Sequence, residues 1–181
     1  MEEVPEPGLR QGQDPEGAFQ RAVLAVIEVL LHRARSDGHI AEYFILQKFG
    51  LDIAVFLKRT NGSSLLRMFE LKAFVGSRQG GVGFGNQRGE GPQVELLMLT
   101  DGQLVLCDAF VRWLLVNGIW QKGTERFVMF DNRRVRDAAM GGVRKGKQNN
   151  LRLSELMKDA VTWDTFCTKI GTFLMSSGSS E

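Results

Sequence analysis

Two acids and a lysine lie in or beside apolar stretches in the first half of this 181-residue chain. Asp52 stands at the start of one apolar run, and Glu70 and Lys72 lie two residues apart in the next. Residues i and i+2 of a strand point to the same face. Burying two carboxylates and an ammonium group among apolar side chains is costly unless they pair or bind a cation. A divalent metal held by Asp52 and Glu70, with Lys72 beside it, would satisfy all three groups.

Such a site suggests one class of reaction. Mg²⁺ takes oxygen ligands, usually one or two protein carboxylates completed by waters and substrate phosphate. A bound metal polarises a phosphodiester and activates a water, and a neighbouring lysine orients that water or offsets charge on the phosphate. The residue types therefore suggest metal-dependent phosphodiester hydrolysis. The alternative is a hairpin in which Asp52 lies in the entry turn and Glu70 and Lys72 form a solvated ion pair.

A hairpin and a preceding helix would position these groups. Asn61-Gly62, a strong hairpin signal, separates apolar runs at 51–57 and 65–74. Asp14 as N-cap and Pro15 at the first helical position predict a helix that runs to about residue 35, where 36–38 end it. A first strand is expected at 40–49. The helix carries an apolar stripe of Phe19, Val23, Val26, Ile27, Leu30 and Leu31.

Asp52 followed, across a hairpin, by Glu70-Leu71-Lys72 resembles the PD-(D/E)XK nuclease superfamily. That superfamily has the restriction-endonuclease-like fold and includes Holliday-junction resolvases and VRR-NUC domains. The resemblance implies that Asp52 and Glu70 are metal ligands, that the Leu71 carbonyl adds a ligand, and that Lys72 is the catalytic lysine. Leu51 stands where the family motif often has proline, a residue that shapes the turn and does no chemistry.

The helix offers a third acid. Glu16 and Gln20 stand four apart and share a helix face. In the superfamily the first helix often supplies an auxiliary acid, and an acid followed by Gln four residues later resembles the opening of VRR-NUC domains. Glu16 is therefore the candidate third ligand, with Glu28 and Glu42 as rivals, and Gln20 is a candidate nucleic-acid contact. Glu16 equally suits the helix N-terminus through the helix dipole.

A glycine-rich segment at 76–92 follows Lys72 and carries Arg78 and Arg88. Glycine lets the backbone approach a phosphate, and arginine binds phosphate oxygens bidentately. A mobile surface loop is the equally weighted alternative. The G-x-G-x-x-G pattern of a dinucleotide site is absent. Gln93 is a further candidate, because many of these nucleases place Gln or a basic residue on the helix after the E-x-K strand.

The C-terminal third is basic. From residue 112 to 158 there are eleven basic residues and four acidic ones. The densest part predicts a flexible loop that contacts a phosphate backbone, and a solvated basic surface is the alternative. Residues 141–148 nearly form a P-loop, but Gln148 replaces the hydroxyl that binds Mg²⁺. The candidate phosphate contacts here are Arg133, Arg134, Arg136, Arg144, Lys145 and Lys147.

The remaining pattern predicts a single α/β domain at 15–175, with disordered tails at 1–14 and 176–181. The resemblance implies that this domain is a restriction-endonuclease-like mixed sheet flanked by helices. We expect a hairpin or a short helix at 93–106, a helix from Asp108 to 117, and a strand at 125–130. Thr162 or Asp164 would cap a last helix that packs on the sheet or forms a dimer face. Its apolar face is Trp163, Phe166, Ile170, Phe173 and Leu174.

Composition sets the remaining expectations. A hydrophobic content of 43% and a charged content of 24% are ordinary for a globular protein. No apolar run reaches the length of a membrane span and the acidic start lacks the basic region of a signal peptide, so a cytoplasmic location is expected. The residue patterns and the resemblance together imply a Mg²⁺- or Mn²⁺-dependent endonuclease acting on DNA, with RNA and a homodimer left open. The alternative is an inactive module of the same fold that binds nucleic acid or serves in assembly.

Overall fold

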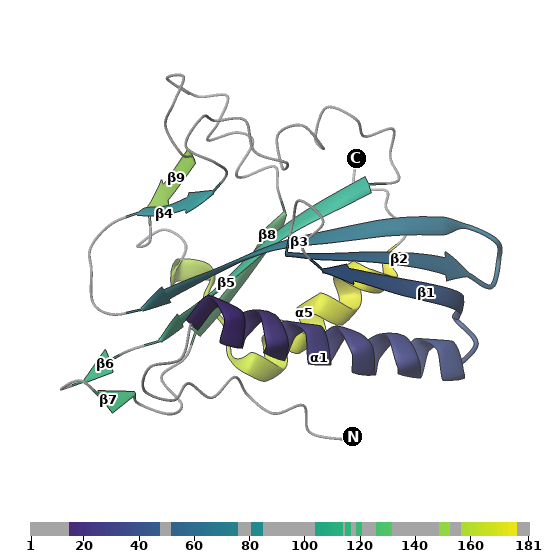
Figure 1. Ribbon diagram of the computed structural model, residues 1–181, viewed down its shortest axis with the longest axis horizontal. Helices are drawn as coiled ribbons and strands as arrows, with labels where there is room; N and C mark the ends of the chain where they lie inside the picture. Colours follow the sequence, from purple (N-terminus) through teal and green to yellow (C-terminus); the bar gives the residue numbers. More distant parts are fainter. Residues whose placement is uncertain are drawn as a thin grey trace.

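The computed structural model describes residues 15–47, 52–75, 81–84, 104–113, 115–116, 119–120, 126–131, 149–152 and 157–176, and side chains at 17–47, 52–69, 71, 127–129 and 158–176. Figure 1 shows the helices and strands in chain order. They are α1 (Pro15–Ser36), β1 (Ile40–Gln47), β2 (Ile53–Arg59), β3 (Ser64–Val75), β4 (Gly81–Phe84), β5 (Leu104–Trp113), β6 (Leu115–Val116), β7 (Ile119–Trp120), β8 (Arg126–Asp131), β9 (Asn149–Arg152), the 3₁₀ helix η1 (Met157–Asp159) and α5 (Trp163–Met175).

The main sheet is mixed. Its described strands follow the order β1-β2-β3-β5-β8. β3 and β5 run parallel, whereas the other neighbours are antiparallel. Two short antiparallel pairs, β4 with β9 and β6 with β7, lie outside this sheet. The described chain is therefore of the mixed α/β class, built on a β1-β2-β3 meander that follows α1.

The β2-β3 hairpin confirms the prediction made from Asn61-Gly62. Gly62 has φ of 86°, a conformation that favours glycine. Its N–H donates to the Arg59 carbonyl at 3.0 Å, and the Arg59 N–H donates to the Ser63 carbonyl at 2.8 Å. The Asn61 side-chain oxygen accepts from the Ser63 N–H at 3.0 Å. The turn thereby fixes the register in which Ile53 faces Phe69.

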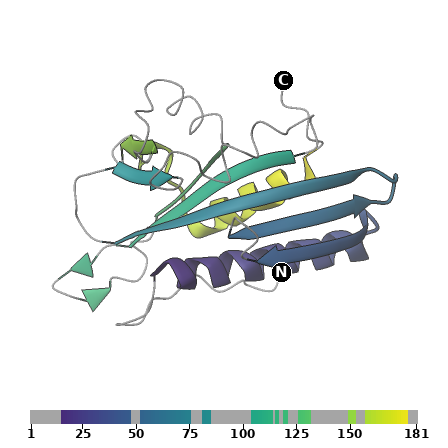
Figure 2. The ribbon, with the colours of Figure 1, turned by 45° about the horizontal axis from the view of Figure 1, so that its top comes forward.

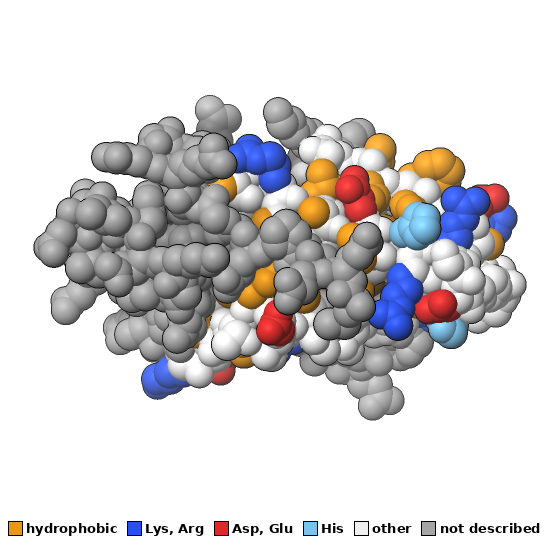
Figure 3. All heavy atoms as spheres, turned by 90° about the horizontal axis from the view of Figure 1, so that it is seen from below, with side chains coloured by type: hydrophobic (Ala, Val, Ile, Leu, Met, Phe, Trp, Pro, Cys, Tyr) orange, Lys and Arg blue, Asp and Glu red, His pale blue; other side chains and the backbone are white. Residues whose placement is uncertain are grey.

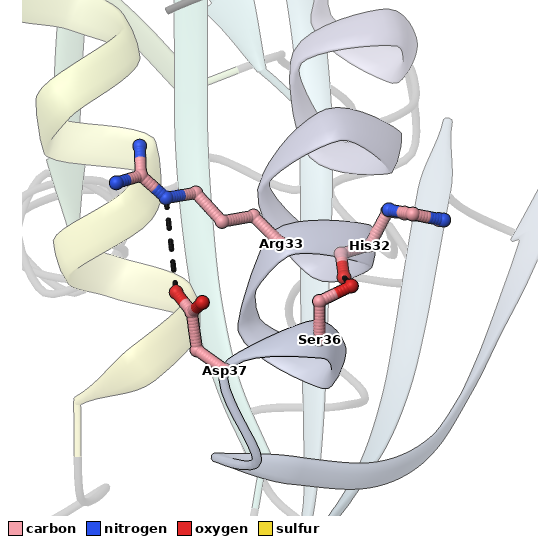
Figure 4. A network of polar contacts seen from close by, with 4 residues as sticks. All are labelled: His32, Arg33, Ser36 and Asp37. Carbon is pink, nitrogen blue, oxygen red and sulfur yellow. Dashed lines mark hydrogen bonds and ion pairs between the residues drawn. The ribbon is translucent and has the colours of Figure 1, made fainter.

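The helix predicted from 15 to 35 is α1, although Asp14, its expected N-cap, lies outside the described residues. Gly38, with φ of 75°, follows its C-terminus. In the last turn the Ser36 hydroxyl donates to the His32 carbonyl and Arg33 forms an exposed ion pair with Asp37 (Figure 4). Seen from below, charged and histidine side chains gather at this end of the described surface (Figure 3).

Both described helices pack against the same face of the sheet (Figure 2). Alternate residues of β3, among them Phe69 and Leu71, are fully buried on that face beside the apolar stripes of α1 and α5. The two helices approach closely where a Cβ on Gly171 would lie 3.6 Å from Leu30. On the opposite face Phe44 and Phe56 are exposed. Neither helix in this described part is long and apolar enough to cross a membrane.

Aromatic rings pack α5 against β8, an edge strand of the main sheet. Phe127 of β8 lies 4.9 Å from Trp163 and 5.3 Å from Phe166, measured between ring centroids. Phe19 of α1 lies 5.8 Å from Phe166. Backbone bonds between Phe127 and Val161 hold the residue before the helix N-cap beside β8. The helix predicted from its apolar face is thus confirmed, with Thr162 at the N-cap position.

The remaining predictions of helices and strands are confirmed only in part. The helix predicted from Asp108 to 117 is wrong, since 108–113 belong to β5, which pairs with β3 and β8. The strand predicted at 125–130 is confirmed as β8. Strand β1 matches the strand expected at 40–49 as far as Gln47. Ser176, assigned to the tail, is the C-cap of α5. The possible hairpin turn at 101–102 and the tail at 1–14 lie outside the described residues.

A buried arginine joins β3 to the C-terminus of α5. Arg67 is fully buried, its Nε donates to the Phe173 carbonyl at 3.0 Å, and its Nη2 donates to the Ser176 carbonyl at 2.6 Å. The Nη2 of Arg59 reaches the same Ser176 carbonyl at 2.8 Å. Burial, and secondly the charge of Arg59, lowers the pKa of Arg67. Two cations thus complement the negative end of the helix dipole.

Replacing Arg67 by Met should lower the free energy of unfolding by about 1–3 kcal/mol, because the Phe173 and Ser176 carbonyls lose a charged donor. Urea denaturation followed by circular dichroism measures the change. Arg33→Met is the matched control, since Arg33 is exposed and its ion pair with Asp37 is a surface contact. Equal stability of the two variants would show that the guanidinium does not hold α5.

Cys167 on α5 should behave as a weakly acidic thiol. Burial, and secondly the charge of Asp164, raises its pKa to about 11. The chain has one other cysteine, Cys107, which is replaced by Ser so that only Cys167 reacts. We expect the alkylation rate at Cys167, followed by mass spectrometry, to rise from pH 9 to 11 instead of reaching a plateau near pH 9. The unfolded chain releases this proton near pH ~8.5, so this group's contribution to folding stability falls as pH rises between about 8.5 and 11.

Candidate active site

Asp52 lies directly before β2 and is half-buried. Its Oδ2 accepts a hydrogen bond from the Leu71 backbone N–H at 2.6 Å. Its Oδ1 accepts one from the Gln20 side-chain amide, also at 2.6 Å. Three elements thus meet at one carboxylate: α1 through Gln20, the start of β2 through Asp52, and β3 through Leu71.

The unequal lengths of β2 and β3 explain the first bond. The β2-β3 ladder ends at the pair Ile53 and Phe69, whereas β3 continues to Val75. Beyond Phe69 the β3 backbone has no β2 residue beside it, and a buried N–H needs an acceptor. The Asp52 carboxylate supplies that acceptor for Leu71. The bond places Asp52 beside the peptide group that joins Glu70 to Leu71.

The second bond depends on the packing of α1. Phe19, the neighbour of Gln20 in the chain, is fully buried in the aromatic cluster. Val23, one turn further on, is also fully buried. This packing fixes the rotation of the helix and carries Gln20 to the start of β2. The bond joins residues 32 positions apart in the chain.

The bonded carboxylate keeps capacity for a cation. An ionised carboxylate has about four acceptor positions, and these two hydrogen bonds occupy one on each oxygen. The donors orient the group without neutralising it, because an amide and a peptide N–H carry no formal charge. Hard divalent cations bind such oxygens. The donor chemistry at Asp52 therefore fits Mg²⁺ or Mn²⁺.

Glu70 and Lys72 lie two residues apart in β3, one on each side of Leu71. Their side chains lie outside the described ones. In the parallel pairing of β3 with β5, Glu70 is level with Asp108 and Lys72 is level with Phe110. Sequence patterns had assigned Asp108 to a helix cap. The register instead places a further acidic residue on the strand next to the E-x-K motif.

The positions of the three candidate auxiliary acids differ. Glu16 lies one turn before Gln20 on α1, a rise of about 6 Å, and its side chain is outside the described ones. Glu28 is exposed and lies about 12 Å beyond Gln20 along the helix axis. Glu42 is exposed and pairs with Lys58, about 17 Å along β2 from Ile53. Proximity to the Gln20–Asp52 bond therefore favours Glu16.

The two segments expected to contact phosphate meet through their backbones. β4 lies within the glycine-rich segment and pairs with β9 at the end of the basic segment, Gly81 facing Arg152 and Phe84 facing Asn149. Sequence patterns had predicted loops at both places, because neither strand carries a local signal of its partner. The candidate contacts Arg78, Arg88, Gln93, Arg133, Arg134, Arg136, Arg144, Lys145 and Lys147 lie outside the described residues.

Among the described residues, no group of three or more His, Cys, Asp or Glu side chains is placed to hold a metal. Of the predicted ligands, only the Asp52 carboxylate is among the described side chains. Comparison of the chain with known protein families, with curated proteins and with solved structures finds no match. The case for a function therefore depends on the geometry around Asp52.

Asp52→Ala should lower the free energy of unfolding by about 1–3 kcal/mol, because the Leu71 N–H and the Gln20 amide both lose their acceptor. Asp52→Asn should cost less than about 1 kcal/mol. Its remaining carbonyl oxygen accepts from Leu71, and Gln20 can turn its own oxygen toward the new amide. Urea denaturation compares the two variants. A loss as large in Asp52→Asn as in Asp52→Ala would contradict this account of the two bonds.

Proposed function

We propose that this chain is a divalent-metal-dependent endonuclease of the PD-(D/E)XK type, with the restriction-endonuclease-like fold, that hydrolyses phosphodiester bonds in DNA. The observation that carries the proposal is the 2.6 Å bond from the Leu71 N–H to Asp52 Oδ2. This bond brings the isolated acid of the motif beside the peptide group between Glu70 and Leu71, although the two parts are 19 residues apart.

The order of elements supports the same proposal. The resemblance implies a core in the order helix, strand, strand, strand, and α1, β1, β2 and β3 follow that order, with β5 parallel to β3. Asp52 lies directly before β2 and Glu70 lies within β3, which supports the proposal. A hairpin whose Asp52 merely lay in a solvated entry turn would not explain a half-buried carboxylate bonded by two separate elements.

In the proposed mechanism Asp52, Glu70 and the Leu71 carbonyl would hold Mg²⁺ or Mn²⁺. Glu16 completes the acidic set, and Asp108 joins the candidates because it is level with Glu70. A metal held there would supply Lewis-acid chemistry, polarising the phosphodiester and making a bound water more acidic. Lys72 orients the attacking water and offsets charge that develops on the phosphate.

Substrate binding would use the segments joined by β4 and β9. Their arginines and lysines bind backbone phosphates and release counterions, which gives affinity without sequence specificity. DNA is the proposed substrate, and RNA is tested alongside it. A homodimer is proposed only if cleavage needs two sites at once.

A second function is favoured by one observation. Both oxygens of Asp52 already accept hydrogen bonds from the protein, so the carboxylate also serves as a structural link between α1 and β3. A chain that used Asp52 only in this way would be an inactive module of the same fold that binds nucleic acid or serves in assembly. The two functions differ in their response to metal.

Cleavage of supercoiled plasmid and of labelled branched and single-stranded DNA, with a matched RNA, tests the proposal in Mg²⁺, Mn²⁺ or EDTA. We expect metal-dependent cleavage that Asp52→Asn and Lys72→Ala reduce roughly 100-fold or more, since each substitution removes several kcal/mol of charge stabilisation. Lys58→Ala is the matched control for Lys72→Ala, because Lys58 is an exposed lysine on β2. Its activity should equal that of the wild type.

Absence of cleavage on every substrate, together with salt-sensitive DNA binding, would replace the nuclease by the binding module. Cleavage that persists in folded Asp52→Asn and Lys72→Ala would place the chemistry elsewhere.

A further inference from the structure

We propose that Gln20 is the positioning residue of the metal site, which holds the Asp52 carboxylate in the orientation that binds a divalent cation. This inference rests on the proposed function and assigns Gln20 a role toward the protein's own acid instead of toward nucleic acid. The 2.6 Å bond from Gln20 Nε2 to Asp52 Oδ1 is the observation that carries it.

One hydrogen bond alone does not fix a carboxylate. The torsion that turns the carboxylate plane of an aspartate has broad preferences. With only the Leu71 N–H bound to Oδ2, the group could turn about that contact. A second donor on the other oxygen removes this freedom. Because Gln20 and Leu71 belong to different elements, both the position and the plane of the carboxylate are set by the fold.

The donor itself is held rigidly. Gln20 follows Phe19, whose fully buried ring lies 6.1 Å from that of Phe127 and 5.8 Å from that of Phe166. The core therefore fixes the height and rotation of α1 at this turn. A site held by side chains on packed elements keeps its geometry better than one on a loop.

The chemistry of glutamine suits this position. Arginine or lysine would orient the carboxylate but would also offset its charge and weaken its attraction for a cation. The neutral amide orients Asp52 and leaves the negative charge available. The remaining acceptor positions of each oxygen stay open to a metal. Ligating carboxylates in metal sites are commonly held by hydrogen bonds of this kind.

Titration with Mn²⁺, followed by calorimetry and by the electron paramagnetic resonance of free Mn²⁺, tests the role without any cleavage assay. Gln20→Met keeps the length of the side chain and removes the donor. We expect it to weaken Mn²⁺ binding about 10–100-fold. Arg35→Met, at an exposed position of α1 about 22 Å along the helix axis from Gln20, is the control and should leave the affinity unchanged.

Gln20→Glu gives an independent signature. It sets a carboxylate oxygen where the amide nitrogen lies 2.6 Å from Asp52 Oδ1. The two like charges repel, so the metal-free variant should melt below the wild type. A divalent cation relieves that repulsion, so Mn²⁺ should raise the melting temperature of Gln20→Glu by more than it raises that of the wild type.

The outcomes separate this inference from the proposed function. Wild-type Mn²⁺ binding that Asp52→Asn abolishes, with unchanged affinity in folded Gln20→Met, would overturn the role of Gln20 and leave the nuclease standing. If Gln20→Met only lowers the melting temperature, Gln20 is a structural residue and the inference also fails. Failure of the wild type to bind Mn²⁺ in an Asp52-dependent way would overturn the metal site and both proposals with it.

Discussion

The burial of one face of β3 beneath α1 and α5 is the constraint on which the rest of the structure depends. Leu65, Arg67, Phe69 and Leu71 alternate along the strand, and all four are buried. A shift of the strand by one residue would expose this entire set, so the register is strongly determined. That register also decides which backbone N–H lies just past the end of β2. The geometry at Asp52 is therefore a consequence of the core.

Arg67 also fixes the position of α5 along β3. The Phe127–Val161 backbone bonds hold the N-terminal end of α5, and hydrogen bonds from Arg67 to the Phe173 and Ser176 carbonyls fix its C-terminus against β3. The arrangement has a cost, because Arg67 Nη1 is buried and has no hydrogen-bond partner among the described residues. The other guanidinium hydrogen bonds offset this cost and join the C-terminus of α5 to β3 at one position.

Local signals predicted the helix and the strands of the described N-terminal region, and they predicted that Asp52 lies near the strand that carries Glu70. The Asn61-Gly62 turn and the alternation around it brought Asp52 close to Glu70, since both lie within one hairpin. The bond between Gln20 and Asp52 could not be predicted in the same way, because it depends on how α1 rotates against the sheet. Residues 108–113 were misassigned because their apolar spacing also fits a helix, and the parallel pairing of β5 with β3 is non-local. The β4-β9 pair was not predicted for the same reason, because its pairing is also non-local.

The two bonds to Asp52 also separate folding from metal binding. In small metal-dependent domains the ligands have no other partners, so the free energy of metal binding is largely the free energy of folding. Here Gln20 and Leu71 already satisfy the carboxylate, and the hairpin is held to α1 by protein donors alone. Under the proposed function, a cation bound at Asp52 would therefore meet a preformed ligand whose orientation needs little rearrangement.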